Sequence, residues 1–597
     1  MIRITELKLP LEAVPFEVRR ASDAPAETDA DRQLPPHPIE ALSALAAQLL
    51  GVAPGQVKQL TVFKRSFDAR KSQLQVVYIV DVALASVALE ADCLARHPKH
   101  PHIGPSPDMG WHPPVLVPGD ARSTQPRPVV VGFGPCGMFA ALVLAQMGLK
   151  PLVIERGKPV RQRTKDTWGL WRRQQLHTES NVQFGEGGAG TFSDGKLYSQ
   201  IKDPRHLGRK VMQEFVRFGA PEDILFAAHP HIGTFKLVKV VEGLREEIMR
   251  LGGEIWFEHR VCDVQMDGER QLVGLQVEDL QSGAKRQIDT RHVVMALGHS
   301  SRDTFTMLHR HGVRMQAKPF SIGVRIEHPQ SLIDQARWGR HAGHPLLGAA
   351  DYKLVHHAQN GRAAYSFCMC PGGTVVAATS EPNRVVTNGM SQYSRAERNA
   401  NAGLVVGIDP GDFPQDPALI EQVVGEGREV VRLEVSDAPD GIHPLSGIVL
   451  QRQLEGAAFV AGGGGYLAPA QRLGDFLAHR PSTQLGKVEP SYQPGVTPCD
   501  LATVLPEYAV QAMREALPVF GRKIRGYDLP DAVLTGVETR TSSPLRIDRD
   551  DESLQSPNCA GLYPAGEGAG YAGGILSAAV DGIRVGEALA CAWVGER

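Results

Sequence analysis

Residues 128–157 read PVVVGFGPCGMFAALVLAQMGLKPLVIERG and decide the fold of the chain around them. The apolar run Val129–Val131 is typical of a short buried strand. A glycine-rich turn follows it, and a helical pattern over Met138–Met147 ends at Gly148. A second apolar run, Pro151–Ile154, leads directly into an acid. This order of strand, turn, helix and strand predicts a Rossmann-type βαβ unit.

Three glycines in the turn match the spacing G-x-G-x-x-G. Gly132 permits the tight turn, Gly134 lets the backbone approach a pyrophosphate, and Gly137 lets the helix pack closely on the strand. The N-terminus of the helix offers free N–H groups and a positive dipole end to phosphates. Glu155, about 20 residues beyond the glycines, is placed to accept hydrogen bonds from ribose hydroxyls. We therefore predict a dinucleotide site, with a purely structural glycine turn as the alternative.

The composition is that of an ordinary globular protein. The 597 residues suffice for roughly three to four domain-sized units. A net charge of −2 gives no electrostatic reason to expect nucleic acid or an anionic membrane as a partner. No apolar run is long enough for a membrane span, and the N-terminus has no secretory signal. The eight cysteines form no C-x-x-C zinc motif, so we expect reduced thiols in a cytoplasmic protein.

Changes of pattern along the chain predict its domain organisation. Strands around one helix predict a small N-terminal α+β domain over residues 1–96, and a Pro-rich linker follows over 97–127. The dinucleotide-binding domain then has two parts, 128–314 and 531–597. Between them, 315–530 has strands broken by Gly/Pro loops and no second G-x-G-x-x-G after a strand. We interpret it as an inserted α+β substrate domain.

Two charged or polar segments in the N-terminal part of the chain are weak candidates for a binding site. The segment KRSFDARK contains Lys64, Arg65, Arg70 and Lys71, which we interpret as a solvated face rather than a phosphate site. The linker is rich in histidine, but no helical or strand face holds these side chains at a fixed spacing. We therefore favour no metal site there.

Two further glycine-rich segments extend the predicted site. FGEGGAGTFSDGKLYS, residues 184–199, implies backbone held close to a ligand or forced into positive φ, with an ordinary surface loop as the alternative. Near the C-terminus, GLYPAGEGAGYAGGILSAAVDGIRVGEALA repeats the order strand, glycines, helix. It places Glu567 at a strand end and a helix N-terminus, suited to an anionic group, at 573–575. Between these segments a three-stranded meander leaves the parallel sheet, and the chain returns to it at Val293–Gly298.

The first and last segments together resemble the FAD-binding domain of glutathione-reductase-type flavoproteins. More closely, the chain resembles a largely uncharacterised family of bacterial FAD-dependent dehydrogenases with an extra N-terminal domain. The resembling segments are KRSFDAR, GFGPCGMFAA, GEGGAGTFSDGKL, SFCMCPGG, VETRTSSPLRI and PAGEGAGYAGGI. The resemblance implies an α/β, glutathione-reductase-type FAD-binding Rossmann fold with an inserted α+β substrate domain and a small N-terminal α+β domain. The paired cysteines of disulfide reductases are missing from the first helix, where Cys136 stands alone.

The resemblance also implies the cofactor, FAD held non-covalently, and its binding residues. The G-x-G-x-x-G glycines and Glu155 hold the ADP half. Glu567 stands where many members have an Asp on the ribityl chain, and residues 573–575 line the pyrimidine edge of the isoalloxazine. The complete predicted set is Gly132, Gly134, Pro135, Cys136, Gly137, Glu155, Arg156, Gly188, Gly190, Thr191, Val261, Ala296, Gly298, Gly566, Glu567, Gly573, Gly574 and Ile575.

Three groups of residues are candidates for the chemistry itself, because a flavin needs protein groups to orient and tune it. Lys196 could stabilise reduced, anionic flavin near N1 and C2=O, with a surface lysine as the alternative. Cys368 and Cys370 stand at i and i+2 of an expected strand, so both should point to one face as a thiol pair. Inert buried cysteines are the stronger alternative for them. Arg540 could bind a carboxylate substrate, with a structural salt bridge as its alternative.

We therefore expect an FAD-dependent oxidoreductase, a dehydrogenase or reductase, that acts on an unidentified small molecule. NAD(P)H, if it is used, should bind transiently as the reductant. One alternative is a flavin-binding regulatory or assembly protein without turnover, because the binding motifs are clearer than the catalytic ones. A flavin-dependent RNA-modifying enzyme is the other alternative, and the neutral charge counts against it. The sequence leaves the oligomeric state open.

Overall fold

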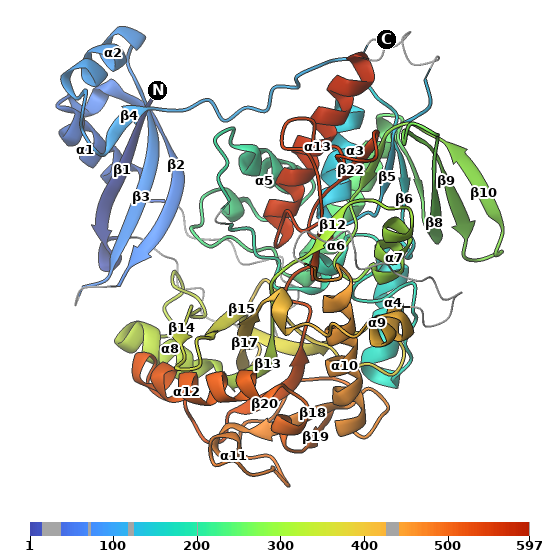
Figure 1. Cartoon of the computed structure of the whole chain (residues 1–597). Helices are drawn as coiled ribbons and strands as arrows, with labels where there is room; N and C mark the ends of the chain where they lie inside the picture. The colour runs from blue at the N-terminus through green and yellow to red at the C-terminus, as the bar shows by residue number, and fades with distance from the viewer. Residues whose placement is uncertain (15–36, 70–72, 118–124, 200, 425–440, 596–597) are drawn as a thin grey trace.

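The computed structural model describes residues 1–14, 37–69, 73–117, 125–199, 201–424 and 441–595 (Figure 1). The described chain forms an N-terminal sheet, a central parallel sheet with a three-stranded antiparallel sheet beside it, and a large eight-stranded sheet. Arg70 and Lys71 of the charged segment KRSFDARK lie outside these described residues. Within the described ranges, no helix combines the length and apolar character needed to cross a membrane.

The N-terminal part is an antiparallel sheet of order β2-β3-β1-β4, on which two helices pack (Figure 1). Its elements are β1 (Ile2–Pro10), α1 (Ile39–Leu50), β2 (Val57–Asp68), β3 (Gln75–Leu84), α2 (Val87–Arg96) and β4 (Ile103–Pro105). Gly51, at φ +65°, ends α1 in the left-handed conformation that glycine favours. β4 lies inside the predicted Pro-rich linker and pairs with β1 as an edge strand, a position that tolerates proline.

The charged segment at the end of β2 contacts the rest of the protein, so its interpretation as a solvated face is wrong for Arg65. Arg65 is 6% exposed. Its backbone N–H donates to the Phe226 carbonyl at 2.7 Å, and its carbonyl accepts from the Ala228 N–H at 3.0 Å. Its guanidinium lies 5.2 Å from the centre of the Phe226 ring. The N-terminal sheet is thereby joined to residues 226–228 by strand-like hydrogen bonds.

The central sheet is parallel, with the order β22-β11-β5-β6-β7. Its strands are β5 (Val129–Val131), β6 (Leu152–Ile154), β7 (Glu254–Trp256), β11 (Val293–Met295) and β22 (Leu562–Pro564). Because side chains alternate along a strand, Val130 and Val294 face one apolar core while Val129 and Val293 face another. The predicted Rossmann-type sheet is therefore present, and both of its faces are buried.

Helices cover one face of this sheet and the predicted meander covers the other (Figure 1). The helical layer contains α3 (Pro135–Gln146), α5 (Leu207–Arg217), α6 (Thr234–Arg250) and α13 (Ile575–Gly595). The opposite layer contains β8 (His259–Met266), β9 (Leu272–Asp279), β10 (Lys285–Asp289) and α7 (Arg302–Arg310). α13 approaches α3 so closely that a Cβ on Gly582 would lie 2.1 Å from the Cys136 carbonyl oxygen. This contact brings the C-terminal segment against the first glycine turn.

The eight-stranded sheet has the order β14-β15-β17-β13-β20-β18-β19, with β16 paired to β15. Its strands are β13 (Phe320–Pro329), β14 (Val355–His357), β15 (Ala363–Ala377), β16 (Thr387–Ser391), β17 (Asn399–Ile408), β18 (Ala468–Arg472), β19 (Val496–Pro498) and β20 (Val533–Glu538). β20 follows the predicted boundary at residue 530, yet it is a strand of this sheet. The domain limits stay a prediction.

Helices around this sheet go beyond what the sequence analysis predicts for the region. They are α8 (Gln330–Trp338), α9 (Pro417–Val424), α10 (Ser446–Ala461), α11 (Leu473–Leu477) and α12 (Glu507–Lys523). α12 contacts β14, β15 and β17, and buries Met513, Leu517 and Phe520. α4 (Val160–Arg173) packs against both α6 and β15, and a short ribbon pairs β12 (Met315–Ala317) with β21 (Leu545–Ile547). These contacts place the eight-stranded sheet next to the carboxyl ends of the parallel strands.

Candidate functional site

A cavity of about 570 Å³ lies at the carboxyl ends of the parallel strands. Its walls come from the turn after β5, the glycine-rich loop at 183–198, the segment after β11, and the start of α13. Residues of β15 and β20, from the eight-stranded sheet, close it on the remaining side. In doubly wound folds the ligand binds at this edge of the sheet. The cavity therefore joins all three glycine-rich segments that the sequence singled out.

The three glycines of the first turn lack side chains for different reasons. Gly132 has φ +96°, and a Cβ there would lie 2.5 Å from the Ala296 carbonyl oxygen. A Cβ on Gly137 would lie 1.9 Å from the Gly132 carbonyl oxygen, so the protein itself requires both glycines. A Cβ on Gly134 would meet nothing nearer than the Gly188 Cα, at 3.5 Å, which is ordinary contact. The fold tolerates a methyl group at Gly134, and only a ligand over the turn would exclude it.

The first helix starts three residues earlier than the sequence pattern predicts. α3 begins at Pro135, and Gly134 is its N-cap residue. Proline is favoured at the first helical position because its fixed φ suits the helix and its missing N–H needs no partner there. The early start directs the helix N-terminus into the cavity, beside Cys136. The free N–H groups of this first turn are suited to a phosphate.

Glu155 connects the first two glycine segments. One carboxylate oxygen accepts the Phe133 N–H at 2.8 Å. The other accepts the N–H groups of Gly157 at 2.8 Å and Gly185 at 3.0 Å. The side chain also lines the cavity. It thus orders the loops, in addition to the ribose contact that stays a prediction.

We expect Glu155→Ala to weaken FAD binding more than FMN binding, because FMN lacks the adenosine ribose. The variant should also melt at a lower temperature, since each buried N–H left without an acceptor costs about 1–3 kcal/mol. Dissociation constants for both flavins, measured with Glu254→Ala as an exposed acid-to-alanine control outside the cavity, test this. An equal loss of affinity for FAD and FMN would place Glu155 away from the ribose.

The second glycine-rich loop lies directly over the first turn. Gly188, at φ +60°, has no room for a side chain because its Cβ would lie 2.9 Å from the Gly134 Cα. Gly187, at φ +90°, faces Thr191, whose hydroxyl oxygen would be 2.0 Å from a Cβ there. Thr191 is therefore buried behind the loop, whereas Gly188 and Gly190 line the cavity. The two loops are therefore in close contact, and the backbone of both lines the cavity.

Arg163 holds this second loop, and the sequence analysis missed it. The side chain is fully buried on α4. Its guanidinium donates to the carbonyl oxygens of Asn181 (2.8 Å), Val182 (2.7 Å), Gly185 (3.3 Å) and Glu186 (2.7 Å). Burial lowers its pKa to about 10, although Glu155 and Glu186 oppose that shift. In the sequence it is one of several basic residues on a helix, and no local pattern marks it as the buried one.

The C-terminal segment forms a further part of the cavity wall. Glu567 lines it just after β22, and burial raises the pKa of this carboxyl to about 7 against the opposing charge of Lys318. Gly573 and Gly574 also line the cavity, and a Cβ on either would meet nothing within 4 Å. Gly566 instead packs against Cys136, behind the wall. Because neither glycine has a side chain, a ligand in the cavity can lie directly against the backbone beside the start of α13.

The structure brings most of the predicted cofactor residues to this one cavity. Its lining includes Gly132, Gly134, Pro135, Cys136, Glu155, Arg156, Gly188, Gly190, Val261, Ala296, Gly298, Glu567, Gly573, Gly574 and Ile575. Arg156 is also bound to Glu179 and Asp303. Gly137, Thr191 and Gly566 are absent from the lining. The role of each residue toward a cofactor stays a prediction.

Lys196 lies on the cavity wall and its side chain is mostly buried. Its ammonium donates to the Met369 carbonyl oxygen and lies 4.0 Å from an Asp194 carboxylate oxygen. Burial opposes the charge, but Cys368 and Asp194 raise the pKa of Lys196 above its ordinary value. Asp194 is itself held by Arg395, and its pKa is lowered to about 2 despite burial. The ammonium is therefore a fixed positive charge at the cavity.

The two cysteines of β15 do not share one face, which corrects the expectation from strand alternation. The pairing of β15 with β17 is irregular between Phe367 and Cys370, and Cys368 has φ +41°. Because this bulge breaks the alternation, Cys368 and Met369 line the cavity. Cys370 is fully buried behind them. The thiol pair is thus divided into one residue facing the cavity and one behind it.

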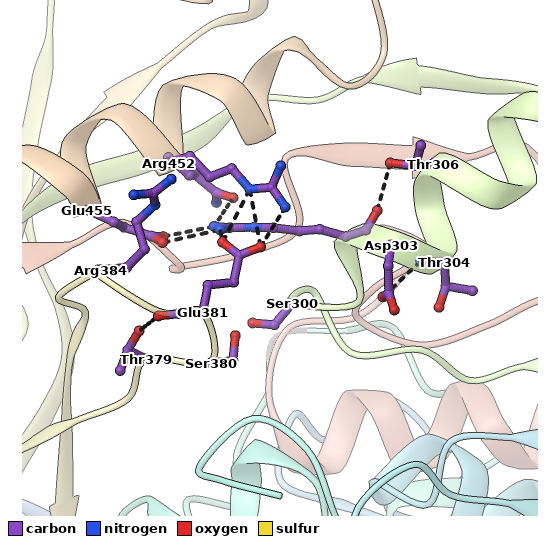
Figure 2. Close-up of polar contacts among 12 residues, drawn as sticks. Ser300, Asp303, Thr304, Thr306, Thr379, Ser380, Glu381, Arg384, Arg452 and Glu455 are labelled. Atoms are coloured by element: carbon purple, nitrogen blue, oxygen red, sulfur yellow. Dashed lines mark hydrogen bonds and ion pairs between the residues drawn. The ribbon is translucent and has the colours of Figure 1, made fainter. Parts of the chain in front are cut away.

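Arg540 lines the cavity but is already bound to protein groups. Its guanidinium donates to both carboxylate oxygens of Glu455, at 3.0 and 2.8 Å, and to the hydroxyls of Ser300 (2.9 Å) and Ser380 (2.7 Å). Arg302 also donates to Glu455, at 2.8 Å, and to Glu381, which Arg452 contacts in turn, so Glu455 belongs to a larger network (Figure 2). The sequence analysis left such a salt bridge as the alternative for Arg540. A substrate contact by Arg540 stays a prediction.

Comparisons with known proteins give a family model and a full-length relative. Residues 319–541 match "FAD-dependent protein, C-terminal domain-like", and residues 1–83 match "Domain of unknown function (DUF8436)". A Clostridium beijerinckii protein named "Uncharacterized protein" is 44% identical over 542 residues, covering 90% of this chain and 93% of the relative. The match thus extends over nearly the full length of both chains.

Solved structures similar to this one include two fumarate reductases. The quinol fumarate reductase of E. coli aligns with 79% of this chain and 71% of its own, at 14% identity and a TM-score of 0.33. The open conformation of a flavocytochrome c3 fumarate reductase aligns with 81% of each chain, at 12% identity and a TM-score of 0.30.

Proposed function

This chain belongs to the same family as the Clostridium protein, a family of FAD-dependent proteins, and we propose that it is an FAD-dependent oxidoreductase that binds its flavin non-covalently. The observation that carries the proposal is the single cavity that joins three glycine-rich segments from distant parts of the chain. Gly134, Gly298 and Gly573 line it, although the protein's own packing leaves room for a side chain at each. An extended ligand that lies against the backbone explains why these positions lack side chains.

The residues that line the cavity match the chemistry of the parts of FAD. The N–H groups at the start of α3 would hold the pyrophosphate beside Gly134 and Gly188, and Glu155 would hold the adenosine ribose. Glu567 would contact the ribityl chain. The bound flavin would supply the electron-transfer chemistry. Lys196 would place a positive charge where reduced flavin carries a negative one, which favours reduction.

We expect the purified protein to be yellow and to carry one FAD per chain. Under anaerobic conditions NADH or NADPH, if either is the donor, should bleach the flavin bands without staying bound. Among the described residues only one βαβ unit carries G-x-G-x-x-G, so no site for a second, stably held dinucleotide is expected. Visible spectra, followed by desalting and nucleotide analysis, measure both properties.

Two results would contradict this proposal. A colourless protein that takes up no added FAD would reject the flavin assignment. A stoichiometric amount of NAD(P)H retained after desalting would reject the single dinucleotide site. Bound FAD that neither NAD(P)H nor dithionite can reduce reversibly would instead favour a flavin-binding regulator without turnover.

A further inference from the structure

Two buried cations hold the segment around Cys368 in a strained conformation beside the cavity. A residue other than glycine at positive φ is strained and persists only where its surroundings impose that conformation, and such residues gather at functional sites. Here Arg325 donates to the Cys368 carbonyl oxygen at 2.9 Å, and Lys196 donates to the Met369 carbonyl oxygen. Glu538 fixes Arg325 in turn, through a contact of 2.8 Å. These contacts turn Cys368 toward the cavity.

The two thiols differ in how readily they ionise. The Cys370 thiol donates to the Cys368 carbonyl oxygen at 3.3 Å, which holds the two cysteines together. The nearby Cys370 thiol lowers the pKa of Cys368 well below its ordinary value, and the charges of Lys196 and Arg325 add to this against the effect of burial. The nearby Cys368 sulfur and burial raise the pKa of Cys370 well above its ordinary value. A thiolate is the reactive form of cysteine. The pair therefore combines one reactive sulfur at the cavity with one protonated sulfur behind it.

Cys136 provides an internal comparison, because it also lines the cavity. Burial and the Asp581 carboxylate raise its pKa well above the ordinary value, against the opposing charge of Arg549. It has no second cysteine beside it in the sequence. Facing the cavity is therefore not enough to make a thiol reactive here. Of these two cavity thiols, Cys368 is the one with a neighbouring thiol and two cations that lower its pKa.

We propose that Cys368 and Cys370 are a redox-active dithiol that exchanges two electrons with the flavin, and that the substrate is a disulfide or the corresponding thiol. This inference rests on the proposed FAD function. When the pair is oxidised, the two sulfurs form one S–S bond and release two electrons and two protons, which convert FAD to FADH2. In the direction of disulfide reduction, the Cys368 thiolate attacks the substrate S–S bond and releases one thiol. Cys370 then attacks Cys368, which releases the second thiol and closes the internal disulfide.

The first test counts electrons in the FAD-loaded protein. Anaerobic titration with dithionite should consume four electrons per flavin in the wild type, because a disulfide and a flavin each accept two. Cys368→Ser and Cys370→Ser should each consume two and keep their FAD. Cys559→Ser, which changes another buried thiol outside the cavity, should still consume four. Melting temperatures of all variants separate this effect from a loss of packing.

A second readout detects the bond directly in the wild type. In the oxidised protein, the peptide with Cys368 and Cys370 should be lighter by two hydrogen atoms and should resist alkylation by iodoacetamide. After reduction both residues should be alkylated. Glutathione disulfide, added anaerobically to the reduced protein, should restore the flavin bands at least about tenfold faster in the wild type than in Cys368→Ser.

The outcomes separate the two levels of the proposal. A protein that binds FAD, consumes two electrons and has both thiols open to alkylation when oxidised would overturn the redox pair and leave the flavin function standing. A protein without FAD would overturn the flavin function itself. Equal rates with glutathione disulfide in the wild type and Cys368→Ser would reject a disulfide as the substrate. A lower melting temperature with an unchanged electron count would make both cysteines packing residues.

Discussion

Gly134→Ala should lose nearly all of its bound FAD and keep its fold. The added methyl group would lie 3.5 Å from the Gly188 Cα, a normal contact, so the protein itself has room for it. The same methyl group would occupy the space over the turn where the pyrophosphate approaches the backbone. We expect FAD affinity to fall by roughly 100-fold, about 3 kcal/mol. The ratio of flavin to protein after purification and a titration of the apoprotein measure the change.

A matched variant at the neighbouring glycine separates binding from folding. A Cβ on Gly137 would lie 1.9 Å from the Gly132 carbonyl oxygen, so Gly137→Ala should yield unstable or insoluble protein. Gly134→Ala should instead melt within a few degrees of the wild-type apoprotein. The wild type is compared without FAD, because bound flavin would raise its melting temperature. Full flavin occupancy in Gly134→Ala would show that the pyrophosphate lies elsewhere, and would reject the assignment of this turn.

Arg163→Met should destabilise the protein strongly and release the flavin with it. Its guanidinium donates to four carbonyl oxygens of residues 181–186, and the side chain is fully buried. Methionine replaces the apolar stem of the arginine side chain but donates no hydrogen bond, so these carbonyls would lose their partner. Each buried carbonyl left without a donor costs about 1–3 kcal/mol, and four of them lose their partner here. Chemical denaturation of the apoprotein and flavin content of the purified variant measure the two effects.

Arg172→Met on the same helix is the control, because that side chain is exposed. It should change the free energy of unfolding by less than about 1 kcal/mol. Arg163→Lys should stay close to Arg163→Met, since an ammonium cannot reproduce the planar set of donors that contacts four separate carbonyls. A stable, yellow Arg163→Met would mean that the second glycine loop keeps its conformation without this side chain.

The predictions for the active chemistry depend on groups that lie far apart in the sequence. Lys196 belongs to the second glycine loop, Cys368 to the eight-stranded sheet, and Glu567 to the segment before α13. The cavity brings them together because α13 packs on α3 and β15 reaches the carboxyl ends of the parallel strands. The inserted sheet therefore supplies one wall of the proposed flavin site.

Local rules were enough to predict the glycine turn and the strands on either side of it, but not β7, whose residues the sequence pattern joins to the meander. Val129–Val131, the G-x-G-x-x-G spacing and Glu155 each depend on residues close in sequence, where steric and hydrogen-bond requirements act directly. The meander and the return of the chain at β11 follow from strand alternation in the same way. These features are determined by residues close together in the chain, so the sequence alone predicts them.

The tertiary structure decided which polar groups are buried and what they contact. Arg163 and Arg65 look like other basic residues in their segments, and only packing makes one a support of the loop and the other a contact with Phe226. The bulge at Cys368 is held by Arg325 and Lys196, 43 and 173 residues away in the chain, which donate to the Cys368 and Met369 carbonyls. Alternation assumes a regular strand and therefore placed both thiols on one face. Long-range contacts of this kind leave no period or motif in the sequence, because their energy comes from elements that meet only when the chain has folded.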